Sequence, residues 1–156
     1  MTVMIKKLAY AFLVSMVPVI ELRGALPIAY AAADKNIWIA LIVTIVGNLV
    51  PVPFIIIFIR KIFALLRKII PKMDGFLCRL EKRAESKSDI VLRSSFWGLI
   101  LLVAIPLPGT GAWTGALVAA MLDMRLKRAF PAIATGVVIA GIIVALITCG
   151  VDAFIV

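Results

Sequence analysis

The residues of this chain best suited to chemistry are Glu21 and Arg23, an acid and a base two positions apart. They lie inside the stretch from Leu8 to Ala33, which carries no other charge and is apolar enough for the middle of a membrane. One such charge at the centre of a membrane helix costs about 2.5–3.5 kcal/mol on translocon scales. Chains rarely keep groups this unfavourable without a use, so the pair predicts a site for a proton, an ion or a charged headgroup in transit.

Glu21 is the candidate proton-coupling residue. A carboxyl group in a medium of low polarity holds its proton more tightly than in water, so it can exchange a proton near neutral pH. Acids used in this way form the proton relays of pumps and transporters. The structural alternative is an ion pair with Arg23, but residues at i and i+2 do not face each other on a regular helix.

A second polar segment, Pro-Leu-Pro-Gly-Thr-Gly from Pro106 to Gly111, is a candidate anion site. Its backbone amides, the Thr110 hydroxyl and the positive end of a helix starting near Trp113 would converge there. The guanidinium of Arg23 suits phosphate or carboxylate. The alternatives are a plain tight turn for the segment and snorkelling to the interface for Arg23. The candidate substrate-binding residues are Arg23, Gly24, Pro27, Pro106, Pro108, Gly109, Thr110, Gly111, Trp113 and Thr114.

Composition places these residues in an integral membrane protein. Of the 156 residues, 64% are hydrophobic, against roughly half in soluble domains, and the mean hydropathy is +1.17. The apolar blocks run from Leu8 to Ala33, Ile37 to Ile59, Phe96 to Leu122 and Ala129 to Gly150. The second and fourth fit one crossing each, since a crossing needs about 20 residues. Asn48, one turn before Pro51, is expected to satisfy a backbone group freed by a proline kink.

The first and third blocks are interrupted by proline and glycine, from Pro18 to Pro27 and from Pro106 to Gly115. Irregular backbone at membrane depth needs partners from protein or from a wet cavity, so each block is predicted to be a re-entrant hairpin. The basic turn that follows the third block supports its return to the cytoplasmic side. For the first block a spanning helix stays open, because Lys6 and Lys7 favour an inside N-terminus.

The organisation repeats along the chain. A shift of 87 residues aligns Gly24-Ala25 with Gly111-Ala112, and each broken block is followed by a spanning one. We therefore expect one membrane domain over residues 1–156, with an inverted repeat of residues 8–59 and 96–150 and a basic cytoplasmic connection over 60–95. Phe76, Leu80 and Ala84 form an apolar stripe in that connection, typical of an amphipathic surface helix; a plain solvated connector explains it equally well.

Several function classes are disfavoured. The net charge of +9 is concentrated in the connection, which the positive-inside rule explains without a nucleic-acid partner. The chain has no histidine, so an imidazole metal site is excluded, and its two cysteines, Cys78 and Cys149, do not suggest a disulfide. No hydrolase or kinase signature is present. We expect neither a cofactor, nor a metal, nor an enzymatic activity.

The motifs Glu-Leu-Arg-Gly-Ala-Leu-Pro at 21–27 and Pro-Leu-Pro-Gly-Thr-Gly-Ala-Trp-Thr-Gly-Ala at 106–116 resemble the small multidrug export family of prokaryotic membrane proteins. The layout is also similar to that of the DedA superfamily, whose members have two facing re-entrant hairpins and include proposed flippases for undecaprenyl phosphate. Glu21 matches the acid of the first hairpin in that superfamily. The arginine of its second hairpin has no counterpart at the tip here, and Arg23 is the candidate substitute.

The expected function is a proton-coupled secondary transporter of the inner membrane that moves an anionic, phosphorylated lipid such as undecaprenyl phosphate. Glu21 would be the proton switch and Arg23 the headgroup clamp. One alternative is efflux of small cationic or amphipathic compounds, with Glu21 as counter-charge; another is a membrane scaffold that transports nothing. A chain this small is expected to form a homodimer to enclose a site.

Overall fold

Helices make up all the regular structure in the part of the chain that the computed structural model describes, residues 2–69, 75, 77–79, 82, 95–107 and 110–155. The first half holds α1 (Thr2–Ser15), α2 (Glu21–Ala32), α3 (Ile37–Leu49) and α4 (Pro51–Ile69). The second half holds α6 (Ser95–Ala104), α7 (Ala112–Met121) and α8 (Leu126–Ile155). The all-helical prediction is therefore confirmed for these residues.

Two helical stretches are long and apolar enough to cross a membrane, as expected for the second and fourth blocks. They are Ile37–Ile59, 23 residues across α3 and α4, and Leu126–Val151, 26 residues within α8. Only 28% and 44% of their most apolar windows are buried. A soluble protein rarely leaves apolar patches of that extent facing water, so the chain is a membrane protein.

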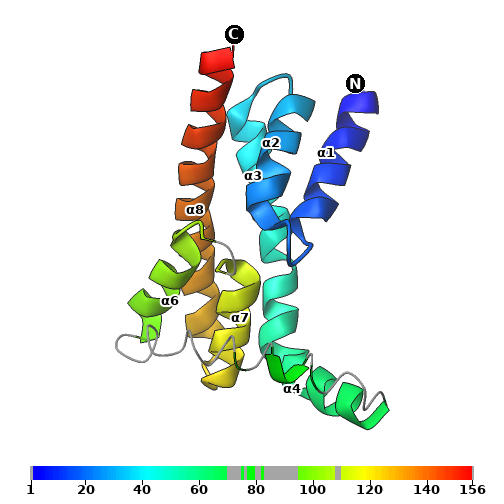
Figure 1. Ribbon diagram of the computed structural model, residues 1–156, viewed down its shortest axis with the longest axis vertical. Helices are drawn as coiled ribbons and strands as arrows, with labels where there is room; N and C mark the ends of the chain where they lie inside the picture. Colours follow the sequence, from blue (N-terminus) through cyan, green and yellow to red (C-terminus); the bar gives the residue numbers. More distant parts are fainter. Residues whose placement is uncertain are drawn as a thin grey trace.

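The junction of α3 and α4 shows how the chain accommodates Pro51. Val50 keeps helical dihedral angles, φ −55° and ψ −48°, and its N–H still donates to the carbonyls of Val46 and Gly47. Pro51 then occupies the first position of α4, where a missing N–H leaves no bond unmade. The interruption is thus confined to Val50, and Figure 1 shows α4 continuing in the direction of α3.

The remaining helices form two antiparallel pairs. Residues 16–20 turn the chain from α1 into α2, and the described residues between α6 and α7 are 105–107 and 110–111. These helices have 14, 12, 10 and 10 residues. At about 1.5 Å per residue, each falls short of the roughly 30 Å hydrocarbon layer. In Figure 1 the α1–α2 pair extends from one end of the molecule and the α6–α7 pair from the other, and the two pairs meet near the middle.

The break in the first block is shorter than the sequence suggested. The irregular stretch was expected from Pro18 to Pro27, whereas α2 already begins at Glu21 and contains Pro27. Pro27 removes only one backbone bond, the one to the carbonyl of Arg23, and its ring lies on an exposed face. The helix therefore continues through it, although interior proline is usually disruptive.

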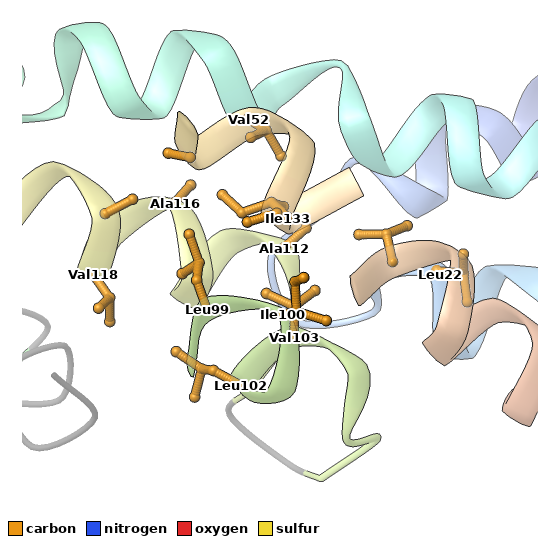
Figure 2. Packing of buried hydrophobic residues seen from close by; sticks show 14 of the residues in the cluster. Leu22, Val52, Leu99, Ile100, Leu102, Val103, Ala112, Ala116, Val118 and Ile133 are labelled. Atoms are coloured by element: carbon orange, nitrogen blue, oxygen red, sulfur yellow. The ribbon is translucent and has the colours of Figure 1, made fainter. Parts of the chain in front are cut away.

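Helix α8 forms the centre of the packing and contacts α2, α3, α4, α6 and α7. Figure 2 shows part of the core, where Val52, Leu99, Ala116 and Ile133 gather from four helices. Glycine permits the closest approach. A Cβ at Gly136 would lie 2.7 Å from the Cβ of Val103, so α6 packs tightly on α8, as small residues allow in membrane bundles.

Exposed basic side chains are more numerous at one end of the molecule than at the other. Lys6 and Lys7 on α1 and Lys35 after α2 lie toward the end that holds the termini. The larger group consists of Lys61 and Lys68 near the end of α4 and Arg125, Lys127 and Arg128 at the turn into α8. These segments lie at the lower end of Figure 1, and both termini lie at the other. The predicted amphipathic stripe of Phe76, Leu80 and Ala84 falls outside the described residues.

Candidate functional site

A small cavity lies where the two helix pairs meet, against the C-terminal end of α3 and the middle of α8. Its lining residues are Glu21, Leu22, Arg23, Asn48, Val103, Gly111, Ala112, Val137 and Ala140. Its volume is about 10 Å³, close to what a single water molecule requires. Three residues predicted for the site, Glu21, Arg23 and Gly111, are thereby brought together from distant parts of the chain.

Glu21 begins α2 in an unusual conformation. Its φ of 52° lies in the left-handed region, which is unfavourable for a residue with a side chain. The side chain is only 5% exposed, and one carboxylate oxygen accepts a long hydrogen bond from the backbone N–H of Trp113 at 3.4 Å. Backbone strain of this kind persists where surrounding structure enforces it and is concentrated at functional sites.

Gly111 makes room for this carboxylate. It precedes α7 with φ 119° and ψ −170°, a conformation that is essentially restricted to glycine. A Cβ at this position would lie 2.1 Å from Oε2 of Glu21. Any other residue would therefore push the acid out of the cavity or open the turn.

Arg23 extends in the other direction, to the end of α6. Its guanidinium donates to the carbonyl oxygens of Leu107 and Ile105, the latter at 3.2 Å, and to Thr110 Oγ1 at 2.9 Å. The Thr110 hydroxyl also lies 2.7 Å from the Ile105 carbonyl. Over the described residues, the structure records no ion pair between Arg23 and Glu21.

The acid and the base are thus matched to the helix ends of the opposite pair. Glu21 lies at the N-terminus of α7, where exposed amides carry partial positive charge, and Arg23 binds carbonyls just beyond α6, where the partial charge is negative. The ring N–H of Trp113 adds a third connection by donating to the Met16 carbonyl at 3.0 Å. The spacing of two residues separates the charges so that each reaches a different helix end.

Two of the other predicted site residues take part in these contacts. Thr110 and Trp113 take part through the bonds above, whereas Gly24 packs against Ile20 and Pro27 is exposed on α2. Pro106 and Thr114 are half-buried outside the cavity lining. Pro108 and Gly109 are outside the described residues.

Asn48 is the site residue that sequence reasoning missed. It is 3% exposed, lines the cavity, and its Oδ1 has no hydrogen-bond partner within the described structure. The expected role, satisfying a backbone group near Pro51, does not account for this oxygen. The signal in the sequence was a polar amide inside an otherwise apolar span. The lining residues Val103, Val137 and Ala140 are apolar and carried no signal of this kind.

Comparison with known proteins identifies the family of this chain. A family model described as "Putative small multi-drug export protein" matches residues 21–143. The match begins at the acid of the cavity and ends within α8, so it includes every residue of the cavity lining. No curated protein and no solved structure matches the chain. Because the model covers well over half of the sequence, the chain belongs to the small multi-drug export family.

Proposed function

We propose that this protein is a secondary membrane transporter that exports small cationic or amphipathic compounds in exchange for protons bound at Glu21. The family's description supports export. The choice of a cationic substrate rests on the different surroundings of the two charged residues at the cavity. The Glu21 carboxylate lines it with one long bond to Trp113, whereas the Arg23 guanidinium is already engaged by oxygens beyond α6.

We further propose that α1–α2 and α6–α7 are re-entrant hairpins in a multi-pass inner-membrane protein. Their short helices support the hairpins, and the larger group of basic residues at one end supports the orientation, because positive charge is retained on the cytoplasmic side. Lys6 and Lys7 lie on the opposite side in this arrangement. The lower end of Figure 1 would then be cytoplasmic. Trp38 and Trp97, 73% and 69% exposed in the first turns of α3 and α6, suit the two opposite interfaces, where tryptophan is enriched.

An inverted repeat is part of the same proposal. Helix α2 contacts α8 while α7 contacts α4, and α1 contacts α3 while α6 contacts α8. This exchange is what a two-fold axis relating the halves would produce. Arg23 also donates to Thr110, a residue 87 positions away, which equals the offset of the sequence repeat. Equivalent residues contact each other only close to such an axis.

The cavity suits a closed state of the transporter. Sites for drug-sized ligands hold roughly 300–1,000 Å³, whereas this cavity holds about 10 Å³, so the hairpin tips would have to separate to admit a substrate. Protonation of Glu21 would weaken its charge-assisted bond to the amide of Trp113 and favour opening. Loss of the proton would favour closure, so substrate and proton would exchange at one carboxylate.

A second candidate is translocation of an anionic lipid, such as undecaprenyl phosphate, which the resemblance to the DedA superfamily implies. Arg23 supports this candidate, because it lines the cavity and the groups that accept its hydrogen bonds beyond α6 are all neutral. A scaffold without transport is a third candidate.

One copy of the chain encloses little space, so the proposal includes a homodimer. We expect no enzymatic activity.

Transport assays in proteoliposomes with an imposed pH gradient distinguish these candidate functions. Flux of tetraphenylphosphonium should be driven by the gradient in the wild type, abolished in Glu21→Gln and retained in Asp34→Asn, an exposed acid with φ 49°. Gradient-driven movement of a fluorescent phosphatidylglycerol, lost in Arg23→Ala, would replace this proposal with the lipid one. Absence of both fluxes would favour the scaffold.

A further inference from the structure

The side-chain oxygen of Asn48 is an unexplained polar atom in the interior. Asn48 lies on α3, is 3% exposed and leaves Oδ1 without a hydrogen-bond partner in the described structure. Burying an amide oxygen without a partner costs free energy that an apolar side chain of similar size would avoid. Its position, lining the same cavity as Glu21, points to a ligand that enters this space.

The neighbours of Asn48 in the cavity supply no protein donor for this oxygen. Helices α6, α7 and α8 contribute only apolar side chains to the lining, namely Val103, Ala112, Val137 and Ala140, and Gly111 lines it just before α7. The ionisable lining residues are Glu21 and Arg23, both from α2. The guanidinium of Arg23 donates to the carbonyls of Ile105 and Leu107, so the acid is the anionic group that this space offers to a ligand.

We propose that Glu21 and Asn48 together bind one small monovalent cation, which is the ion coupled to export. The proposal rests on the transport function above and extends it with a second ligand. A carboxylate and an amide oxygen are hard donors suited to hard cations, and the cavity has room for one water-sized particle. Hydronium and Na⁺ share this chemistry, so the ion site takes one or the other.

In this closed state the cavity admits the ion and excludes the substrate. A volume of about 10 Å³ excludes a drug-sized molecule but not a single ion. Glu21 needs its negative charge to hold Na⁺, so protons compete with Na⁺ and the Na⁺ effect grows as the pH rises. For hydronium the bound state is favoured as the pH falls, and Asn48 accepts a hydrogen bond from the protonated site.

The test measures thermal unfolding of the purified full-length protein in detergent, without any transported compound. One series exchanges NaCl for KCl or choline chloride at constant ionic strength and pH 8, and a second varies pH without Na⁺. The variants are Asn48→Leu and, in case that one does not fold, Asn48→Ala, together with Glu21→Gln. Thr44→Val is the matched control, because Thr44 is equally buried one turn earlier and its hydroxyl bonds to its own helix at Ala40.

A saturable rise of Tm with Na⁺ alone, weakened about ten- to hundredfold in apparent affinity by loss of Asn48 and unchanged in Thr44→Val, identifies a Na⁺ site. A pH-dependent Tm without a Na⁺ effect, shifted in both Asn48 variants and lost in Glu21→Gln, identifies a proton site. Wild-type responses to Na⁺ and pH in a folded Asn48 variant overturn the proposal. Unfolding is measured without flux, so failure of the export assay would not change the result for the ion site.

Discussion

Replacing Gly111 with alanine should damage both the stability and the acid site of this protein. The added Cβ would lie 2.1 Å from Oε2 and 2.8 Å from Cδ of Glu21. Real Cβ atoms do not approach other atoms that closely, so either the carboxylate or the turn before α7 has to move. The backbone angle of φ 119° adds a second penalty, because residues with side chains rarely adopt it.

The two effects can be given magnitudes. Strain at a backbone conformation reserved for glycine is worth about 1–3 kcal/mol, and overpacking by one methyl group in a packed interior about 1–3 kcal/mol. Their sum is about 2–6 kcal/mol, if the two add. For a chain of this size each kcal/mol lowers Tm by about 2–4 °C, so the expected decrease is on the order of 10 °C.

The assay is thermal unfolding followed by circular dichroism in detergent, with Gly150→Ala as control. A Cβ at Gly150 meets no atom within 4 Å, so this change should be neutral or stabilising by up to about 1 kcal/mol through helix propensity. Combining Gly111→Ala with Glu21→Ala should relieve the overlap and leave only the backbone strain. A Tm for Gly111→Ala no lower than that of Gly150→Ala would refute the reasoning about this approach.

Three further substitutions test the cap of α3 and two contacts of the site, each measured as a change in unfolding free energy. Asn36→Ala removes the side-chain cap that accepts from Trp38 N at 3.1 Å and should cost about 0.5–2 kcal/mol; no loss would contradict the cap. Trp113→Phe removes the bond to the Met16 carbonyl and should cost about 0.5–1.5 kcal/mol, whereas an unchanged stability would mean that this connection contributes nothing. Arg23→Lys keeps the charge but loses the fork that reaches three oxygens, so it should cost about 1–3 kcal/mol; full stability in the lysine variant would show that charge alone suffices.

Composition and local pattern were enough to predict much of the fold. The two spanning stretches follow from hydropathy and length, and the end of α6 near Pro106 follows from proline and glycine chemistry. Pro27 was misjudged because its effect depends on which face of α2 it occupies, and this is set by tertiary packing. The family suggested by the motifs at 21–27 and 106–116 is confirmed by the family model.

Some of the residues that line the cavity could be named from the sequence, but their connections could not. Glu21 and Arg23 stood out because charge is unusual at this depth, and Gly111 because it belongs to the segment interrupted by proline and glycine. The bonds from Arg23 to the carbonyls beyond α6 join residues 82 and 84 positions apart, and backbone acceptors leave no trace in a sequence. Asn48 was given a local role, since nothing in its own helix indicates that it shares a cavity with Glu21.

The most direct test of the account is the sidedness of the two ends of each hairpin. In proteoliposomes of a variant with Cys78 and Cys149 changed to serine, single cysteines at Val3 and Asp34 would be labelled with a membrane-impermeant maleimide from either side. Re-entrant α1–α2 predicts that both positions react from the same side, and that cysteines at Trp97 and Arg125 both react from the other. Labelling of Val3→Cys and Asp34→Cys from opposite sides would mean that the first block spans the membrane, and would contradict the facing hairpins on which the transport proposal depends.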